Sequence, residues 1–468
     1  MIKFGTGGWR AIIGDEFTKA NIQQLSQGLC NIMKTKEIVI GYDRRFLSDE
    51  AAKWVSEVLT ANNIKVLFSK KATPTPMTMF IVKERGLEHG IAITASHNPA
   101  LYNGVKLFIQ GGRDADESFT AKLEKEVNQV KPEDIKTIDF EEALDKGLIE
   151  FFDPSNEYID AILEFVDEKA IRKAGLKILV DPMFGVSKTS LSMILNTLRC
   201  DVDIINDRHD TLFGGKLPSP ASANLHQLEN LVVEKSYDMG IATDGDADRI
   251  GIVDENGHFI HPNTLLALLY EYLLEYKGEK GAVVRNLSTT HLLDKIARHH
   301  NEKAIETPVG FKHISENMEK HNALIGGESS GGLTIRGHIL GKDGIFAAIL
   351  LVEMVAVTEK SIGQLVRELE NKYGRTFNLE RDYRFSQEDK VRINNLLFVE
   401  KSLPEFPLNI EKVEYFDGLK VYFEQDAWIS ARFSGTEPLI RVFAEAPSEE
   451  LAATMVRNLE AFLDIEKI

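Results

Sequence analysis

Two short segments of the chain carry the groups that a phosphoryl-transfer centre needs. Residues 94–99 (TASHNP) place the hydroxyl of Ser96 directly after an apolar run, and residues 244–249 (DGDADR) place three carboxylates at alternate positions. A free serine is a poor nucleophile unless it is activated or already phosphorylated. Oxygen ligands without cysteine or histidine favour Mg²⁺ or Ca²⁺ over zinc. A serine that carries a phosphoryl group, beside a cation that neutralises it, would make a phosphotransfer centre.

The residues around Ser96 predict its place in the fold. The apolar run 90–93 predicts a strand, so Ser96 is expected at the carboxyl end of that strand, where open α/β sheets bind ligands. Asn98 and Pro99 predict a turn rather than a continuation of the strand. From these residues alone, a plain turn capped by the serine hydroxyl is an equally good interpretation.

The aspartate segment has a second interpretation, an EF-hand calcium loop, because Glu255 stands at the twelfth position from Asp244. Two features oppose it. The sixth position is Arg249 where an EF-hand needs glycine, and the flanking segments 237–242 and 250–253 predict strands rather than helices. We therefore expect a metal loop between two strands, in which a phosphate on Ser96 would supply a further ligand.

Composition limits the class of protein. The length of 468 residues predicts three or four domains. The net charge of −17 argues against a nucleic-acid partner, so an anionic substrate would have to be held by a few cations and backbone N–H groups. Cys30 and Cys200 form no pairing motif, residues 1–17 do not read as a signal peptide, and the apolar runs 264–274 and 345–357 are too short to span a bilayer. These features predict a cytoplasmic protein without a membrane partner.

The elements that would position the two segments follow a repeated β-α-β pattern. Strands are predicted over 37–41, 64–68 and 90–95 around a helix over 49–61, and over 176–180, 202–205 and 239–242 with a helix over 187–198. A third repeat begins near residue 281, with a helix over 291–299 and an apolar helix after residue 343. This alternation predicts parallel sheets covered by helices. The end of the chain differs, with strands over 419–423, 428–433 and 439–444 before a helix over 448–463, which predicts an α+β unit.

Six segments together resemble the α-D-phosphohexomutase superfamily, the phosphoglucomutases and phosphomannomutases. They are residues 5–10 (GTGGWR), 94–99, 244–249, 307–312 (TPVGFK), 326–332 (GGESSGG) and 432–438 (RFSGTEP). The resemblance implies three consecutive mixed α/β sandwich domains and an α+β C-terminal domain around a central cleft. The expected parts are a phosphoserine domain (1–145), a metal-binding domain (155–255), a sugar-binding domain (256–372) and a phosphate-binding lid (385–468), with linkers in 132–154, 254–262 and 372–387.

The resemblance assigns the reacting end of the site. Ser96 matches the serine that carries the phosphoryl group, and it would bind Mg²⁺ together with Asp244, Asp246 and Asp248. Arg10 matches an arginine that faces the catalytic phosphate.

Proton transfer has several candidates. Lys106 matches a lysine that contacts the reacting hydroxyl and could accept its proton, but only if its pKa were lowered. Lys312 is a second candidate, and His97 would contact phosphate rather than act as the primary base. Some members of the superfamily have a histidine where this chain has Gly332. His338 is the candidate to replace it, and a plain surface histidine is the alternative interpretation.

The resemblance also implies contacts to the sugar and to its second phosphate. Glu328 and Ser330 match residues that bind sugar hydroxyls, Gly310 lies in the loop that includes the candidate lysine, and Arg249 would hold phosphate. The last loop has the donors of a phosphate cradle, although an ordinary β-turn is the alternative from sequence. Its expected phosphate contacts are Arg432, Ser434, Gly435, Thr436 and Arg441.

The predicted function is a phosphohexomutase that interconverts hexose 1-phosphate and hexose 6-phosphate, with glucose 1,6-bisphosphate as activator. Two phosphate sites, one reactive and one passive, are what a mutase needs. Glucose is the expected sugar and mannose a second one. The alternatives are a phosphoglucosamine mutase, a Mg²⁺-dependent sugar-phosphate phosphatase and a non-enzymatic sugar-phosphate sensor. The sequence leaves open the preferred sugar, the general acid–base, the resting phosphorylation of Ser96, and the choice between a monomer and a homodimer.

Overall fold

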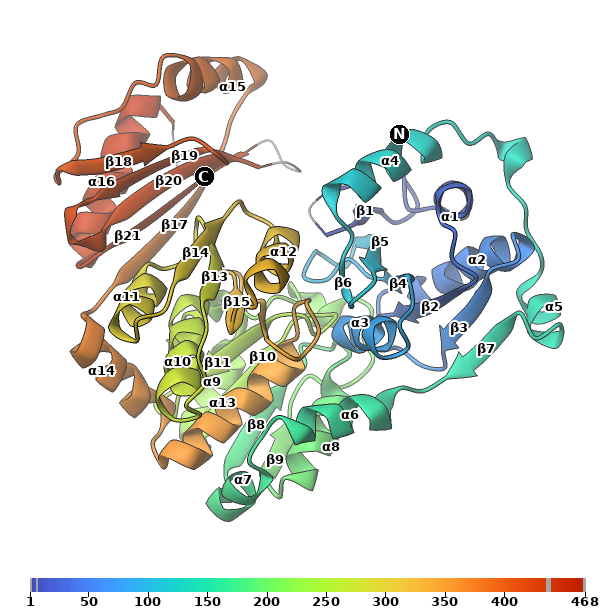
Figure 1. Ribbon diagram of the computed structural model, residues 1–468, viewed down its shortest axis with the longest axis horizontal. Helices are drawn as coiled ribbons and strands as arrows, with labels where there is room; N and C mark the ends of the chain where they lie inside the picture. The colour runs from blue at the N-terminus through green and yellow to red at the C-terminus, as the bar shows by residue number, and fades with distance from the viewer. Residues whose placement is uncertain (1, 6, 435–438, 466–468) are drawn as a thin grey trace.

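The computed structural model describes residues 2–5, 7–434 and 439–465 (Figure 1). Within these residues the named strands form four sheets that follow one another along the chain. The first three sheets mix parallel and antiparallel strands and are covered by helices, whereas the fourth is wholly antiparallel. The predicted fold class is confirmed. No helix in the described ranges is both long and apolar enough to cross a membrane.

The first sheet has its parallel strands buried on both faces, which explains their continuous apolar sequences. Ile40 packs with the residues of α1 and α2, while the adjacent Val39 packs on the opposite face with those of α3. The strand order is β1 (Trp9–Ile12), β5 (Tyr102–Ile109), β4 (His89–Ile93), β2 (Glu37–Tyr42), β3 (Lys65–Ser69) and β7 (Ile149–Phe152), with β6 (Arg113–Asp114) beside β5. The helices are α1 (Lys19–Ile32), α2 (Ser48–Ala61), α3 (Thr75–Glu84), α4 (Glu117–Val127) and α5 (Phe140–Asp145).

The second and third sheets share a core with the first domain through the apolar helix α13 (Gly344–Thr358), which is buried from Gly344 to Ala356. The second sheet has the order β12 (Phe259–Ile260), β11 (Ile250–Val253), β10 (Met239–Thr243), β8 (Lys177–Asp181) and β9 (Asp201–Ile204). Its helices are α6 (Ser155–Glu164), α7 (Glu168–Ala174), α8 (Lys188–Thr197) and α9 (His226–Glu234). The third sheet has the order β14 (Ala304–Thr307), β13 (Val283–Asn286), β15 (Ile325–Gly327) and β16 (Leu333–Ile335). Its helices are α10 (Pro262–Glu275), α11 (Leu292–His299), α12 (Phe311–His321), α13 and α14 (Ile362–Tyr373).

The fourth sheet has a hydrophobic core of its own, which includes Val421, Ile429, Val442 and Met455. Figure 1 shows this C-terminal unit (red) beside β14 and α11, with the N-terminal unit (blue) on the other side of the molecule. The strand order is β17 (Phe377–Arg384), β21 (Leu439–Ala446), β20 (Trp428–Phe433), β19 (Leu419–Phe423) and β18 (Ile410–Glu414). The helices are α15 (Gln387–Asn394) and α16 (Glu449–Leu463).

All three predicted linkers contain regular structure. The segment 372–387 includes the edge strand β17, the segment 132–154 includes α5 and the edge strand β7, and the segment 254–262 includes the edge strand β12. Edge strands expose much of their surface, so they lack the apolar sequence of a central strand. In β17 only Tyr383 is buried. Each of the first three sheets contains parallel strand pairs, as the β-α-β pattern predicted, and also antiparallel pairs.

Candidate active site

Four of the predicted segments occupy the same topological position, one on each sheet. Each one follows a strand and leads into the antiparallel neighbour of that strand: β4 and β5, β10 and β11, β15 and β16, and β20 and β21. We call the connections the serine loop (94–101), the aspartate loop (244–249), the sugar loop (328–332) and the phosphate loop (434–438). The serine loop contacts the aspartate loop through Ser96 and Asp244, and the sugar loop accepts a hydrogen bond at Gly331 from the N–H of Ile250, directly after the aspartate loop.

The hydroxyl of Ser96 points at the aspartate loop. Ser96 is fully buried, and its Oγ donates a hydrogen bond of 2.7 Å to Oδ2 of Asp244. Its φ of +53° lies in the left-handed region, which costs a non-glycine residue roughly 1–3 kcal/mol and persists where the surroundings fix it. The backbone N–H of Ser96 donates to the hydroxyl of Thr94 at 2.8 Å, and His97 Nδ1 lies 3.3 Å from Ser96 Oγ. The serine loop is thus held in a strained turn that aims its hydroxyl across the domain boundary.

Arg45, which the sequence analysis missed, holds the serine loop in place. Its buried guanidinium forms an ion pair with Asp43 (Nε to Oδ2, 3.3 Å), and Asp43 also accepts a 2.6 Å hydrogen bond from the Thr94 hydroxyl. Asp43 and Arg45 directly follow β2, which pairs with β4, the strand before the serine loop. Polar residues directly after a buried strand were the sequence signal that could have identified Arg45. The guanidinium donates at 2.6–3.0 Å to the carbonyl oxygens of Ser96, Asn98, Pro99 and Tyr102.

The three aspartates form a compact cluster suited to a cation. Asp244, Asp246 and Asp248 are all buried, and one oxygen from each lies within 4.8 Å of the others. Oδ1 of Asp246 and Oδ1 of Asp248 have no hydrogen-bond partner among the described residues. Buried carboxylate oxygens without a partner are costly, so this donor set fits a hard divalent ion. The loop joins two strands, β10 and β11, which excludes the EF-hand interpretation.

The protonation of the cluster is uneven. Burial, together with the charges of Asp248 and Asp246, raises the pKa of Asp244 well above its usual value. Burial also opposes ionisation of Asp248, but the neighbouring cations Lys106 and Lys342 hold its pKa well below the usual range. Asp244 therefore keeps its proton most easily, and a cation bound at the cluster would favour its ionised form.

Lys106, on β5, is paired with the aspartates. Its Nζ lies 2.6 Å from Oδ2 of Asp246 and 2.7 Å from Oδ2 of Asp248. Burial by itself lowers the pKa of Lys106, but these two carboxylates outweigh burial and raise it above its ordinary value. The lysine is therefore a cation in this arrangement. Its role as a proton acceptor stays a prediction and requires both carboxylates to be engaged elsewhere.

Further cations surround the serine hydroxyl. Arg10 donates a 2.8 Å hydrogen bond to the side chain of Asn98 in the serine loop, and Arg249 Nε lies 3.9 Å from Oδ1 of Asp248. Burial, and then the charges of Arg249 and Arg10, lower the pKa of His97 well below its usual value, so its imidazole is neutral. An acidic protein thus concentrates positive charge where a phosphoryl group would sit.

Glu328 of the sugar loop contacts two other residues of the predicted substrate site, Gly310 and Ser330. Glu328 Oε1 accepts hydrogen bonds from the backbone N–H of Gly310 (3.3 Å) and from Nδ2 of Asn286 (3.1 Å), and its Oε2 lies 3.5 Å from the Ser330 hydroxyl. Gly310 has a φ of +125°, which other residues rarely adopt. Asn286, at the end of β13, was missed by the sequence analysis.

Lys312 and His338, two of the candidates for proton transfer, each contact a carboxylate outside the aspartate loop. Lys312 begins α12 and pairs with Glu117 of the first domain at 2.6 Å. His338 is buried, with Nε2 2.8 Å from Asp343 and its ring stacked on Phe346 at 4.1 Å. The structure therefore contradicts the interpretation of His338 as a surface histidine, and its role in place of a histidine at Gly332 stays a prediction.

The phosphate loop is described only in part, because Gly435 and Thr436 lie outside the described residues. Arg432 and Arg441 are direct cross-strand partners on β20 and β21. Arg432 Nε donates a 2.8 Å hydrogen bond to Asp417, whose other oxygen accepts the backbone N–H of Val309 at 2.7 Å. Two neighbouring arginines suit an anion. Asp417 ties Arg432 to the third domain, whereas Arg441 Nε lies 3.6 Å from Oδ1 of Asp382. Ser434, the first residue of the loop, donates its N–H to the carbonyl of Leu439 at 2.8 Å.

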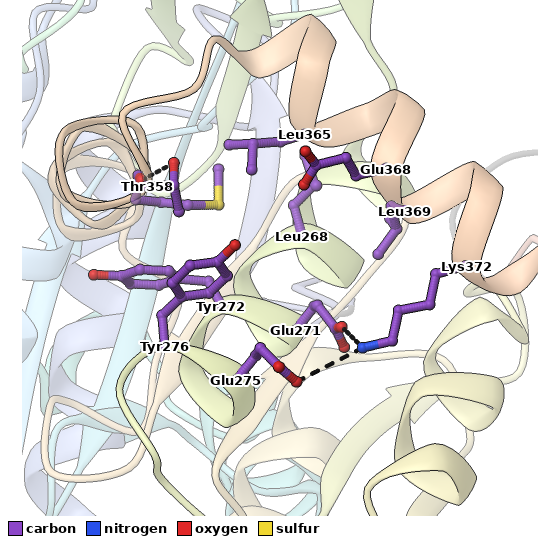
Figure 2. A pocket seen from close by; sticks show the side chains of 11 residues that line it. Leu268, Glu271, Tyr272, Glu275, Tyr276, Thr358, Leu365, Glu368, Leu369 and Lys372 are labelled. Carbon is purple, nitrogen blue, oxygen red and sulfur yellow. Dashed lines mark hydrogen bonds and ion pairs between the residues drawn. The ribbon is translucent and has the colours of Figure 1, made fainter.

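A second acidic group lies away from these loops. Glu271, Glu275 and His300 are also close enough to share a metal ion. Glu271 and Glu275 line a pocket of about 160 Å³ between α10, α13 and α14 (Figure 2), and Lys372 already pairs with Glu271 at 2.6 Å and with Glu275 at 3.6 Å. Both oxygens of Glu271 already accept hydrogen bonds, whereas Asp246 and Asp248 each keep a buried oxygen with no hydrogen-bond partner among the described residues, so the aspartate loop is the better candidate metal site.

Comparison with known proteins agrees with this arrangement. Four profiles named for phosphoglucomutase/phosphomannomutase match consecutive parts of the chain: alpha/beta/alpha domain I over residues 1–134, domain II over 156–257, domain III over 261–373 and the C-terminal domain over 384–461. Together they cover most of its length.

The chain is 32% identical to a phosphoglucomutase/phosphomannomutase of Thermococcus kodakarensis over 96% of this chain and 95% of that protein. It is 29% identical to a phosphoglucosamine/phosphogalactosamine mutase of Sulfurisphaera tokodaii, over 98% and 99% of the two chains. A crystal structure from Thermus thermophilus, described as a "putative phosphomannomutase", superposes with a TM-score of 0.86 at 29% identity and covers 99% of both chains. The chain belongs to the phosphoglucomutase/phosphomannomutase family of the α-D-phosphohexomutase superfamily, and it is a phosphohexomutase, an isomerase of the intramolecular phosphotransferase type.

Proposed function

We propose that this enzyme interconverts hexose 1-phosphate and hexose 6-phosphate through a phosphorylated Ser96, with glucose as the main sugar and mannose as a second one. The observation that carries the proposal is the contact between Ser96 Oγ and Asp244 Oδ2, at 2.7 Å. Lys106 and Arg249 pair with the same aspartate cluster, and Arg10 binds Asn98 in the serine loop. The cross-strand arginines of the C-terminal domain supply a separate place for a second phosphate.

The aspartate cluster and Ser96 would hold Mg²⁺. Such an ion, when bound, supplies charge that neutralises the phosphoryl oxygens during transfer. The protein residues contribute the rest of the electrostatic environment. Arg10 binds Asn98 in the serine loop and Arg249 ends the aspartate loop, and their fixed charges need no reorganisation when the phosphoryl group moves.

The proposed reaction consists of two successive phosphoryl transfers. In the first, the bond between phosphorus and Ser96 Oγ breaks, a bond to the free hydroxyl oxygen of the hexose phosphate forms, and the hydroxyl proton passes to a base, for which Lys106 is the candidate. The resulting hexose 1,6-bisphosphate turns over. In the second transfer its other phosphate returns to Ser96, and the proton returns to the oxygen that is released. Added glucose 1,6-bisphosphate would act as activator by phosphorylating Ser96.

The sugar must be held in both orientations. Glu328 and Ser330 lie on the loop next to the aspartate loop, since the N–H of Ile250 donates to the carbonyl of Gly331 at 3.1 Å. A carboxylate and a hydroxyl can bind ring hydroxyls whichever end of the sugar is phosphorylated. Arg432 and Arg441, with the other residues of the phosphate loop, would hold the phosphate that is not reacting.

A glucosamine phosphate is the second candidate substrate. The observation that favours it is the similarity to the Sulfurisphaera tokodaii enzyme, which covers nearly all of both chains. Glucose, mannose and glucosamine phosphates share the two phosphate positions on which the proposal rests.

The test is conversion of glucose 1-phosphate with Mg²⁺ and a trace of glucose 1,6-bisphosphate, following glucose 6-phosphate and free phosphate together. We expect glucose 6-phosphate with little free phosphate, and no product from Ser96→Ala. The same assay with mannose 1-phosphate and glucosamine 1-phosphate ranks the sugars. Steady release of free phosphate without the isomer would instead support a phosphatase and overturn the proposal.

A further inference from the structure

Asp114 is a carboxylate of the first sheet that the proposed mechanism does not use. It lies on β6 and is the direct cross-strand partner of Phe108 on β5. Opposed residues of an antiparallel pair point to the same face of the sheet, and so do residues two apart on one strand. Asp114 therefore shares its face with Phe108 and with Lys106, which occupies the diagonal position beside it. The sheet brings this carboxylate to the side of the lysine that pairs with the aspartate loop.

The segment that carries Asp114 is tied to the third domain by an ion pair on each side. Nη1 of Arg113 lies 3.4 Å from Oε2 of Glu319, and Oε1 of Glu117 lies 2.6 Å from Nζ of Lys312. Both partners belong to α12, and the backbone N–H directly before this helix donates to the carboxylate of the sugar loop. The two ion pairs therefore bring Asp114 and the sugar loop to the same boundary between domains.

The charges around Asp114 come from all three α/β domains. Burial raises the pKa of Asp114, and the ammonium groups of Lys342 and Lys106 oppose this increase. The carboxylates of Asp248 and Glu328 raise the pKa further. Because Asp248 belongs to the aspartate loop and Glu328 to the sugar loop, Asp114 lies within electrostatic reach of both ends of the candidate site.

The carboxylate of Asp114 forms no hydrogen bond or ion pair with any residue in the described ranges. Its side chain is only partly exposed, and a carboxylate that is neither paired nor fully hydrated is costly. The nearby Asp116, by contrast, accepts a hydrogen bond of 2.8 Å from the N–H of Phe119 and caps α4. Asp114 is therefore available to accept hydrogen bonds from a ligand.

We propose that Asp114 is a further substrate-binding residue of this enzyme, whose carboxylate accepts hydrogen bonds from ring hydroxyl groups of the hexose. A ring that directs one hydroxyl at Ser96 and others at Glu328 must lie between the two loops that Asp114 faces. Hydrogen bonds to an ionised carboxylate are charge-assisted and roughly twice as strong as neutral ones. No bond to Asp114 forms or breaks, and no proton passes to it. This inference rests on the proposed function and adds a contact from the first domain to those of the sugar loop.

The first test compares Asp114→Asn with Asp114→Ala. Asparagine keeps one acceptor oxygen without the charge, so we expect KM for glucose 1-phosphate to rise about tenfold, with a smaller change in kcat. Alanine removes the acceptor, and its KM should rise further. The thermal midpoint of both variants should hold or rise, because each removes a carboxylate that has no partner. Asp145→Asn, at an exposed residue that ends α5, is the matched control and should leave KM unchanged.

The second test identifies the hydroxyl, with the 2-deoxy, 3-deoxy and 4-deoxy forms of glucose 1-phosphate. The wild type should lose kcat/KM on the sugar that lacks the hydroxyl bound by Asp114, and Asp114→Ala should lose much less on that same sugar, because the contact is already gone.

Three results would overturn the inference and leave the proposed function in place. They are equal losses on every deoxy sugar in both enzymes, equal effects of asparagine and alanine on KM, and a lowered thermal midpoint in both variants. A wild-type enzyme without mutase activity on any hexose phosphate would instead overturn the proposed function, and this inference with it.

Discussion

The hydroxyl of Ser96 donates a hydrogen bond of 2.7 Å to Oδ2 of Asp244, across the boundary between the first and second domains. Both ends of this contact are fixed. Arg45 holds the carbonyl of Ser96 at 2.6 Å, and Oδ1 of Asp244 accepts the backbone N–H groups of Asp248 (2.9 Å) and Arg249 (3.0 Å). Ser96 and the candidate metal loop are therefore held in position by contacts within the protein.

If the aspartate loop is the metal site, Mg²⁺ should raise the thermal midpoint of the enzyme, because a ligand that binds only the folded state stabilises it. Asp248→Asn should remove most of this shift and chelation should abolish activity. Glu275→Gln, in the second acidic group where Lys372 already pairs, should leave the shift unchanged. The measurement is a melting curve with and without Mg²⁺. A shift lost in Glu275→Gln but kept in Asp248→Asn would place the metal at the second acidic group and contradict the assignment to the aspartate loop.

Arg45→Met should destabilise the first domain and disable Ser96. The substitution leaves the buried Asp43 carboxylate without its ion-pair partner, and breaking a buried pair costs about 3–5 kcal/mol. We expect a lower thermal midpoint and little phosphorylation of Ser96 by glucose 1,6-bisphosphate. Arg45→Lys keeps the charge but loses the fork of donors, so it should recover the midpoint more than the phosphorylation. Equal recovery of both would show that the carbonyl contacts do not position the serine.

Asp417→Asn should weaken substrate binding more than turnover. Asp417 orients Arg432 and ties it to the N–H of Val309, and a charge-assisted hydrogen bond contributes about 1.5–3 kcal/mol. We expect KM for the hexose phosphate to rise about tenfold or more, with a smaller change in kcat. Asp426→Asn is the control, because Asp426 also pairs across the third and fourth domains, with Arg298 at 3.0 Å, but on an exposed surface. Equal effects of the two variants would point to general loosening of the domains.

The contact between the third and fourth domains should weaken in acid. His291 is buried, with Nε2 3.1 Å from Nζ of Lys420, and burial followed by the charges of Arg285 and Lys420 lowers the pKa of His291 to about 3. An unfolded histidine has a pKa of about 6.5, so the unfolded chain binds more protons between these values. This contribution to stability is therefore complete above about pH 6.5 and is lost as the pH falls toward 3.

The measurement for His291 is the thermal midpoint at about pH 7 and about pH 5, on either side of the unfolded pKa. His291→Gln keeps an acceptor but cannot titrate, so its midpoint should fall less on acidification than that of the wild type. His226→Gln, at an exposed histidine beside Glu229, should behave as the wild type does. Identical pH dependence in all three proteins would refute the assignment.

Local sequence could predict the parts of the site whose chemistry is contained in one loop. Ser96 and the three aspartates have a recognisable spacing next to apolar strands, and β10 and β4 are apolar because they are buried. Arg45, Asp417 and Lys342 could not be found in this way, because their importance depends on partners far away in the chain. The close approach of Gly332 to the side chain of Lys342 likewise exists only once the sugar loop packs against the segment before α13.

The errors in the predicted fold have a related cause. The edge strand β17 is mostly polar, so it looked like a linker. His338 looked like a surface histidine near the sugar loop, but its partner Asp343 caps α13 and draws the ring into the core. Both errors come from contacts that no local pattern contains.

The most direct test of the account is the fate of a phosphoryl group on Ser96. The enzyme is incubated with Mg²⁺ and glucose 1,6-bisphosphate, freed of excess ligand, and then given glucose 1-phosphate, with intact and peptide masses measured at each stage. We predict a gain of one phosphoryl group on Ser96, followed by its loss with formation of glucose 1,6-bisphosphate. A phosphoryl group on another residue, or one released from Ser96 only as free phosphate, would contradict the account.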